Sequence, residues 1–337
     1  MSPIVIQIPC FNEEATLPQT IDAIRVATAG MADVLILIVD DGSVDDTIEV
    51  ARRCAADYVA KLPGHRGLAH AYMAGLSASL RLGAEIIVNT DADNQYVAAD
   101  ILKIIEPIAA GQADIVVGAR PISTIEHFSW LKRQLQWLGT ATIRWLSNTQ
   151  VLDATSGFRA ISREAALRFN VFTPFTYTLE TLIQGGRNGL RVASIPVRVN
   201  PPTRPSRLFH SNTQYISKSM VHILRVYTIY EPLRTYAVLG LVPFIVASLL
   251  SSRYLALVLF VDPARSHAPS LILAAILFSV SFIFWAVGII GDLVAANRRL
   301  LEDIQIEQRR ARLRYGGPLD LDEGFELLPL KNAGHPV

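Results

Sequence analysis

The feature that most constrains this 337-residue chain is a run of 23 residues, 269–291, without a single charged side chain. At a rise of about 1.5 Å per residue, a helix of that length covers the roughly 30 Å hydrocarbon core of a membrane. A second apolar run, residues 235–261, precedes it and contains Pro243 and Arg253. Together the runs predict a transmembrane hairpin over 235–291. For the earlier run alone, a buried helix of a soluble protein is the alternative.

Basic residues on either side of the hairpin predict its orientation. Arg225 and Arg234 precede it, and Arg253 and Arg265 lie near the connection. A larger group of arginines follows the hairpin: Arg298, Arg299, Arg309, Arg310, Arg312 and Arg314. Because cytoplasmic flanks carry an excess of Lys and Arg, both termini and the N-terminal region are expected on the cytoplasmic side of the inner membrane.

The segments around the hairpin complete the expected organisation. Residues 211–234 combine aromatic and basic side chains, which favours an amphipathic juxtamembrane helix. Residues 292–337 predict a basic cytoplasmic helix followed, after Arg314, by a loosely ordered tail. Two spans per chain are few, so the hairpin is also a candidate surface for homo-oligomer formation.

Composition agrees with a lipid partner and argues against a nucleic acid. Hydrophobic residues make up 51% of the chain and charged residues only 18%. The 31 Lys and Arg are balanced by 30 Asp and Glu. Nucleic-acid binding needs a concentrated basic surface, which this balance does not favour.

Residues 1–210 alternate short β-branched runs with longer amphipathic ones, as in "IVIQIP", "VLILIVDDGS" and "EIIVNTDAD". Such alternation predicts βαβ units and a mostly parallel sheet, so the fold class is α/β. Ligands of these sheets bind at the carboxyl ends of the strands. The polar clusters "PCFNEE", "DDGSVDD", "NTDADNQ" and "GAR" all fall at such ends.

The cluster after the run "EIIV" carries Asp91, Asp93 and Gln95 at alternate positions. Alternate residues of an extended chain point the same way, so a strand tip or the turn after it can aim these three oxygen-bearing side chains at one point. Oxygen ligands suit Mg²⁺ or Mn²⁺, which usually complete their shell with substrate phosphates. The spacing predicts a metal-diphosphate site. An isolated D-x-D is more often a plain surface loop, and here its position after a predicted buried strand gives it meaning.

Four motifs in order, "PCFNEE", "VDDGSVDDT", "TDAD" and "DATSGFRAISREA", resemble those of family 2 glycosyltransferases of GT-A fold, over roughly residues 3–210. Within that family the chain is most similar to the polyprenyl-phosphate sugar transferases typified by dolichyl-phosphate mannose synthase. The resemblance implies a Rossmann-like GT-A domain that uses a UDP- or GDP-linked sugar as donor, with Mg²⁺ or Mn²⁺ as cofactor. It implies a metal trio of Asp91, Asp93 and Gln95. The donor-binding residues it implies are Pro9, Phe11, Glu13, Asp40, Asp41 and Asp91. For Asp41, Gly42 and Ser43, a turn with a helix cap is the structural alternative.

The resemblance also implies a polyprenyl phosphate acceptor, undecaprenyl or dolichyl, whose head arginine side chains would bind. The residues at the matching positions are Arg120, Arg133, Arg204, Ser206 and Arg207. The stretch with Arg204, Ser206 and Arg207 departs from the family pattern because Pro205 stands in place of the usual glycine. His65 also departs, standing where an asparagine is frequent, and no chemistry is assigned to it. Residues 127–147, with three tryptophans, are interpreted either as an interfacial helix or as an amphipathic helix packed on the sheet.

Direct displacement by an ionised acceptor phosphate would invert the sugar and needs little help from a base. Asp93 is assigned a catalytic role as a ligand of the metal. Asp153 and Glu180 complete the catalytic set with a positioning role, for which an ion pair with Arg159 or another core cation is the alternative.

Two other functions remain open at this point. One is a transferase that acts on another lipid or a polysaccharide. Processive synthases of the family carry a Q-x-x-R-W motif, but Arg144-Trp145 has Ala141 at the Gln position and comes too early. The other is a membrane scaffold that binds a nucleotide-sugar without turnover, which the intact acidic trio disfavours.

Overall fold

The computed structural model describes residues 3–121, 140–171 apart from 142 and 146, 177–201, 225, 228–260, 268–315 and 324–330. The chain divides into two compact units. The first consists of residues 1–212 together with 305–337, and the second of residues 213–304. The predicted domain borders at 210 and 291 therefore differ from this division mainly at the C-terminal end, where the last part of the chain belongs to the first unit.

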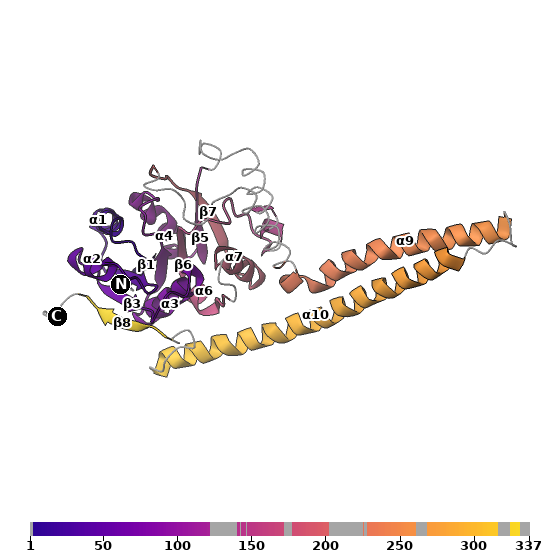
Figure 1. Ribbon diagram of the computed structural model, residues 1–337. Coiled ribbons are helices and arrows are strands. Elements are labelled where there is room, and N and C mark those ends of the chain that lie inside the picture. The colour runs from indigo at the N-terminus through magenta and orange to yellow at the C-terminus, as the bar shows by residue number, and fades with distance from the viewer. Residues whose placement is uncertain are drawn as a thin grey trace. The chain divides into compact units, whose positions relative to one another are not determined.

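The first unit is built around one mixed sheet (Figure 1). Within the described residues its strand order is β7-β5-β6-β4-β1-β2-β3-β8. The strands are β1 (Ile4–Cys10), β2 (Val34–Asp40), β3 (Tyr58–Lys61), β4 (Ile86–Asn89), β5 (Ile115–Ala119), β6 (Arg159–Ser162), β7 (Val192–Pro196) and β8 (Glu326–Pro329). β6 runs antiparallel to its neighbours β4 and β5, and β8 runs antiparallel to β3. The other strands are parallel, which confirms the predicted α/β class.

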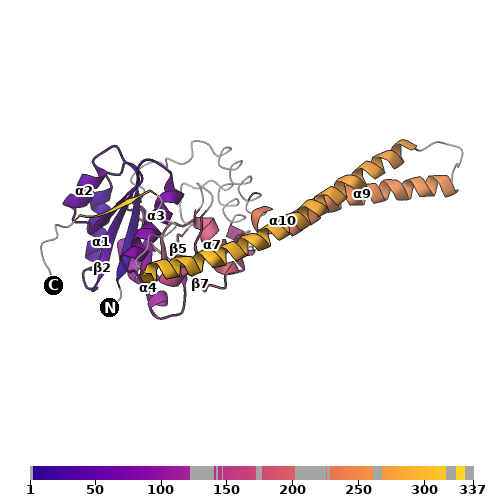
Figure 2. The ribbon, with the colours of Figure 1, turned by 90° about the horizontal axis from the view of Figure 1, so that it is seen from below.

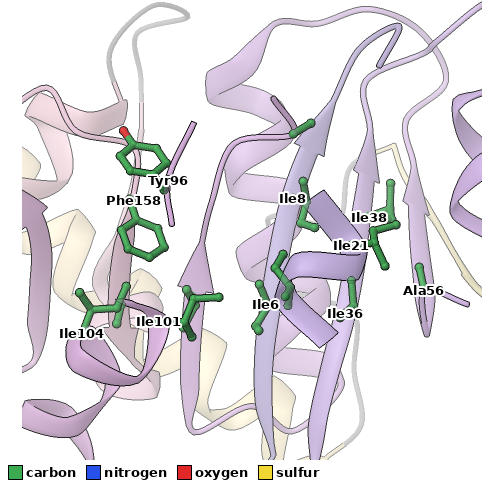
Figure 3. Close-up of a cluster of buried hydrophobic side chains, with 14 of the residues drawn as sticks. Ile6, Ile8, Ile21, Ile36, Ile38, Ala56, Tyr96, Ile101, Ile104 and Phe158 are labelled. Carbon is green, nitrogen blue, oxygen red and sulfur yellow. The ribbon is translucent and has the colours of Figure 1, made fainter. Parts of the chain in front are cut away.

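Helices cover both faces of this sheet (Figure 1). They are α1 (Leu17–Thr28), α2 (Thr47–Arg53), α3 (Leu68–Arg81), the short 3-10 helix η1 (Ala98–Asp100), α4 (Ile101–Ala109), α6 (Arg163–Arg168) and α7 (Tyr177–Arg187). The central strands are apolar on both sides because both sides are covered. Figure 3 shows Ile6, Ile8, Ile36 and Ile38 from one side of β1 and β2 clustered near Ile21 of α1. Burying one such side chain stabilises the fold by roughly 1.5–3 kcal/mol.

The C-terminal tail corrects one expectation. A loose tail was predicted after Arg314, but residues 326–329 form β8 and pair with β3. Leu328 and Leu330 pack on the hydrophobic core, and the Leu330 amide donates to the Asp57 carbonyl at 3.0 Å. β3 would otherwise be an open sheet edge with unpaired backbone groups, and the tail covers that edge.

The second unit contains one long helix and most of another. α9 (Pro232–Phe260) and α10 (Ala268–Tyr315) are both long and apolar enough to cross a membrane, and little of either apolar window is buried. They lie side by side (Figure 1 and Figure 2): the Trp285 indole donates to the Ala237 carbonyl at 3.3 Å and packs on Gly240, where a Cβ would come within 2.6 Å of its nitrogen. These helices match the two predicted spans. Most of the predicted juxtamembrane helix, 211–234, lies outside the described residues.

Candidate active site

The loops that follow β1 and β2 are bonded to each other. The Asn12 amide donates to Ser43 Oγ at 3.0 Å, and the Val44 amide donates to Asn12 Oδ1 at 2.9 Å. The Glu13 amide donates to Thr47 Oγ1 at 2.9 Å. Asn12 adopts a positive φ of 56°, a conformation that asparagine tolerates better than most residues. The motifs "PCFNEE" and "DDGSVDD" therefore brace one another, in addition to any role in ligand binding.

Asp41 fixes the loop that leads from β3 to α3. Its two carboxylate oxygens accept the amides of Arg66 and Gly67, each at 2.8 Å. His65 Nδ1 also lies 2.8 Å from Asp41 Oδ2, and the His65 ring stacks on Phe11 with a centroid distance of 3.9 Å. Asp41 thus places a half-exposed aromatic pair beside the ends of β1 and β2. Sequence reasoning missed His65, because only the fold brings it next to Phe11.

The predicted donor-binding residues at this end, apart from Phe11, are all buried, Asp41 included. Pro9 is buried within β1, and Asp40 is buried at the end of β2, where its Oδ1 accepts the Ser43 amide at 3.2 Å. Glu13 is buried and accepts the Thr16 hydroxyl at 2.8 Å. Pro9 and Asp40 are therefore enclosed at the strand ends, whereas Phe11 is partly exposed.

The acid-rich loop after β4 is a tight turn. Asp93 Oδ1 accepts the Gln95 amide at 3.1 Å, and Asn94 between them has a positive φ of 54°. The turn is held from outside: the Thr20 hydroxyl of α1 donates to the Ala92 carbonyl at 2.8 Å, and Asn200 Nδ2 donates to the Asn94 carbonyl at 2.8 Å. The turn therefore has a defined shape, with Asp91, Asp93 and Gln95 all half-buried.

Asp91 lies in a crowded, negative environment. Burial raises the pKa of its carboxyl to about 6, the charge of Asp93 and to a lesser degree Glu13 adds to this rise, and Arg120 opposes it. A divalent cation between Asp91 and Asp93 would relieve this repulsion, so the donor set fits Mg²⁺ or Mn²⁺. Among the described residues, no three or more His, Cys, Asp or Glu side chains gather as a group that could hold a metal ion.

Arg120 and Asp153 form a buried ion pair next to this loop. Arg120 Nε and Nη2 donate to the two oxygens of Asp153 at 2.7 and 3.2 Å, and Nη2 also donates to Thr155 Oγ1 at 2.8 Å. Burial favours a neutral Asp153 carboxyl, but the hydrogen bonds and charge of Arg120 outweigh it and lower the pKa. The cation that pairs with Asp153 is therefore Arg120, which follows β5, and not Arg159.

A buried polar network supports the loop that carries Gly157. Asn89, the last residue of β4, accepts from Gln7 Nε2 at 2.9 Å and donates to the Gly157 carbonyl at 2.8 Å. A Cβ on Gly157 would lie 3.1 Å from Asp91 Oδ1 and 3.0 Å from the Tyr177 hydroxyl, so a larger residue here would press on both groups. The only sequence signal for the network was two amides, Gln7 and Asn89, within otherwise apolar strands.

Arg159 is fully buried and bonds to neutral oxygens: the carbonyls of Ala154, Ser156 and Thr178 and the Thr181 hydroxyl. It thereby ties the loop after Asp153 to the first turn of α7. Glu180, predicted to have a catalytic or positioning role, is buried in that same turn of α7.

Several predicted acceptor residues lie outside the described part of the chain. These are Arg133, Arg204, Ser206 and Arg207, together with most of the predicted helix over 127–147. Their roles stay predictions. Of the predicted phosphate-binding set, Arg120 is described, and its guanidinium group is bonded to Asp153.

A mostly parallel sheet with an acidic turn at the end of a central strand is the arrangement of an α/β enzyme that binds its ligands at the strand ends. A model described as glycosyl transferase family 2 matches residues 5–169. An uncharacterized glycosyltransferase of Mycobacterium bovis is 32% identical over 206 residues, which cover 59% of this chain and 86% of that protein. The chain therefore belongs to glycosyltransferase family 2, and the resemblance inferred from its motifs is confirmed.

Two further relatives have named activities. Polyprenol monophosphomannose synthase of Mycolicibacterium smegmatis is 29% identical over 201 residues, covering 56% of this chain and 74% of the relative. Undecaprenyl-phosphate mannosyltransferase of Micrococcus luteus is 26% identical over 200 residues, covering 56% and 80%. These similarities extend over little more than half of this chain.

Solved structures show the same fold. Glucosyl-3-phosphoglycerate synthase of Mycobacterium tuberculosis, in complex with Mn²⁺, UDP and phosphoglyceric acid, matches with a TM-score of 0.52 at 20% identity and covers 66% of this chain and 78% of that one. Mannosyl-3-phosphoglycerate synthase of Rubrobacter xylanophilus matches with a TM-score of 0.52 at 16% identity, covering 67% and 74%. The first unit accordingly has the GT-A fold.

Proposed function

We propose that this glycosyltransferase moves a sugar from a UDP- or GDP-linked donor to a polyprenyl phosphate at the cytoplasmic face of the inner membrane, with inversion at the anomeric carbon. The observation that carries the proposal is the acidic turn of Asp91 and Asp93 beside the Arg120–Asp153 pair, in a chain with two helices of membrane-crossing length. The relatives named for polyprenol and undecaprenyl phosphate transfer support this acceptor class.

On the donor side, Asp91 and Asp93, with Gln95, would hold Mg²⁺ or Mn²⁺ together with the diphosphate. Such a cation, when bound, offsets the charge that builds on the departing nucleoside diphosphate. The neighbour of the same fold that holds Mn²⁺ and UDP supports this donor class. The partly exposed Phe11–His65 pair and the adjacent Asp41 form the side of the site suited to a nucleoside.

On the acceptor side, a phosphate monoester with a second pKa of about 6 is largely ionised at neutral pH. One of its oxygens forms the bond to the anomeric carbon while the bond to the nucleoside diphosphate breaks, and a single displacement of this kind inverts the centre. Asp153 is unsuited to accept a proton because Arg120 lowers its pKa. We assign the pair a positioning role, with Arg120 as a positive charge near Asp91. Arg133, Arg204, Ser206 and Arg207 are proposed to bind the acceptor phosphate.

The test uses the full-length protein in detergent, with UDP-glucose or GDP-mannose as donor and undecaprenyl phosphate as acceptor. We expect nucleoside diphosphate release and lipid-linked sugar only when both the lipid phosphate and Mn²⁺ are present. Asp93→Ala should lower the rate by about a hundredfold or more, since even indirect partners of a metal site contribute roughly 10- to 100-fold. Asp22→Ala, at an exposed position on α1, serves as the matched control.

Three outcomes would contradict parts of the proposal. Wild-type turnover by Asp93→Ala would show that the metal assignment is wrong. Release that does not depend on lipid phosphate would contradict the acceptor. Binding of a nucleotide without transfer to the lipid would instead favour a scaffold.

A further inference from the structure

The C-terminal segment 324–330, which we call the strap, runs beside the loop that borders the proposed donor site. In the antiparallel ladder between β3 and β8, Lys61 pairs with Glu326. Residues that precede Glu326 therefore lie beside residues that follow Lys61, and these lead through residues 62–67 to the start of α3. A segment more than 250 residues away in the sequence thus reaches the loop that contains His65.

The strap contacts this loop through a glycine. Gly324 has a φ of +101°, and a Cβ added to it would lie 3.3 Å from both Nη1 and Nη2 of Arg66. The Arg66 guanidinium therefore packs directly on bare backbone, where a side chain would be strained by the positive φ and the guanidinium would have to move by a few tenths of an ångström. The next residue, Phe325, packs its ring under the Arg81 guanidinium at 5.2 Å, at the other end of α3.

The loop itself is closely fitted to the donor side of the site. The Arg66 and Gly67 amides are bonded to Asp41, and His65 is held between Asp41 and the Phe11 ring. Gly64 packs so tightly on Gly42 that a Cβ at Gly42 would come within 2.6 Å of the Gly64 carbonyl carbon. Because the Arg66 amide is bonded to Asp41, which also holds His65, a displacement of the Arg66 backbone would reach both of those residues.

The far end of the strap is anchored firmly enough to act as a support. Leu330 is nearly buried and Leu328 packs on the same core cluster, while the Leu330 amide bonds to the Asp57 carbonyl. The contact of Gly324 with Arg66 is thus made by a segment fixed to the sheet, not by a free tail.

We propose that the strap is a positioning element for nucleotide binding: Gly324 supports Arg66, and Arg66 in turn holds the loop that is bonded to Asp41 and presents His65 to the nucleoside. This inference rests on the proposed function, since it needs the nucleotide to bind beside Phe11 and His65. It adds to that function a role for residues outside the four motifs.

The test measures binding of UDP and of GDP, each with Mn²⁺, to the full-length protein by calorimetry. Gly324→Val should weaken binding of the preferred nucleotide by about three- to tenfold, the size of effect that contacting residues usually have on one another. The matched control is Gly111→Val, which also replaces a glycine of positive φ, +66°, but has open space around it and lies before β5, away from the carboxyl ends of the parallel strands. It should bind nucleotide as the wild type does.

A second variant, Arg66→Ala, removes the exposed partner without backbone strain. We expect it to weaken binding by a similar factor, and the double variant to be no weaker than either single one, because both break the same support. Hydrogen exchange gives an independent readout: the Arg66 and Gly67 amides should exchange faster in Gly324→Val than in Gly111→Val.

Each result decides the inference. Equal nucleotide affinity in Gly324→Val and Gly111→Val would overturn it. A double variant whose loss of nucleotide affinity equals the product of the losses in Gly324→Val and Arg66→Ala would overturn it as well. If the wild type binds neither UDP nor GDP in the presence of Mn²⁺, the proposed function fails and this inference fails with it. If the wild type binds nucleotide and the variants bind it equally well, the inference is wrong but the proposed function stands.

Discussion

At the scale of single residues, the buried ion pair of Arg120 and Asp153 sets the charge and the position of both side chains. The Asp153 side chain is fully buried and that of Arg120 is 17% exposed. A buried arginine with its carboxylate removed is an uncompensated charge, which destabilises a protein far more than loss of a surface ion pair. The pair therefore supports the loop beside Asp91 through both its charge and its geometry.

Asp153→Asn should lower the free energy of unfolding of the catalytic unit by about 3 kcal/mol, which corresponds to roughly 6 °C or more in the midpoint of thermal unfolding. Arg120→Met combined with Asp153→Leu should regain much of that stability but not the transfer rate, because the positive charge near Asp91 is lost. Thermal unfolding and the transfer assay together distinguish the roles. An Asp153→Asn variant that unfolds like the wild type yet has lost all transfer would identify Asp153 as a base.

The acidic turn and the aromatic of the first motif could be predicted at this scale, because Asp91, Asp93 and Phe11 sit in motifs that are read locally. His65, Asn89 and Arg159 could not. Each acquires its role from a partner distant in sequence: His65 from Phe11 and Asp41, Asn89 from Gln7 and the Gly157 carbonyl, and Arg159 from the first turn of α7. Single-sequence patterns do not report which distant residues meet.

At the scale of elements, the end of α10 is bound to the catalytic unit through α6. Arg309 is buried, and its Nη1 donates to the carbonyls of Leu167 and Phe169, each at 2.9 Å, while Nη2 donates to Asn170 Oδ1 at 2.6 Å. Leu167 lies in the last turn of α6 and Phe169 directly follows it, where helix carbonyls lack partners within the helix. Arg309 therefore caps α6 from another element.

Arg309→Ala should destabilise the catalytic unit by about 3 kcal/mol, because it leaves several buried acceptors without a donor. The adjacent Arg310 is more exposed, bonds to the carboxylates of Glu164 and Glu307, and offers a control: Arg310→Ala should change stability little. Thermal unfolding of the two variants in the same detergent makes the comparison. Equal effects of the two substitutions would contradict the capping role.

The strands and helices of the N-terminal region could be predicted because β-branched runs and amphipathic runs alternate there. The strand in the C-terminal tail could not be predicted in this way. β8 has only four residues, Glu326–Pro329, and it forms because β3 offers an uncovered edge and Leu328 and Leu330 can reach the core. Strand formation of that kind depends on tertiary context more than on local propensity.

At the scale of the whole molecule, the chain joins a GT-A catalytic unit to two helices of membrane-crossing length. Large apolar side chains such as Val242, Leu249, Phe282 and Ile290 are well exposed on these helices, which is the reverse of what a soluble protein shows. Lipid contact explains this exposure, as the uncharged run in the sequence predicted.

The full-length protein should therefore stay in the membrane fraction after washing with high salt and with alkaline carbonate, and should be released by detergent. Charge-based attachment through the arginines after residue 297 alone would be weakened by salt. Immunoblotting of the fractions is the measurement. Release by salt without detergent would contradict the spanning of the bilayer by α9 and α10.

The central claim is direct displacement of a nucleoside diphosphate by an oxygen of a polyprenyl phosphate. The most direct measurement is the anomeric configuration of the sugar in the lipid product, determined by NMR and compared with that of the donor. Direct displacement predicts one sugar linked through a single phosphate to the polyprenol, with its configuration opposite to that of the donor. A product that keeps the configuration of the donor, or one whose sugar is not attached to the lipid phosphate, would contradict it.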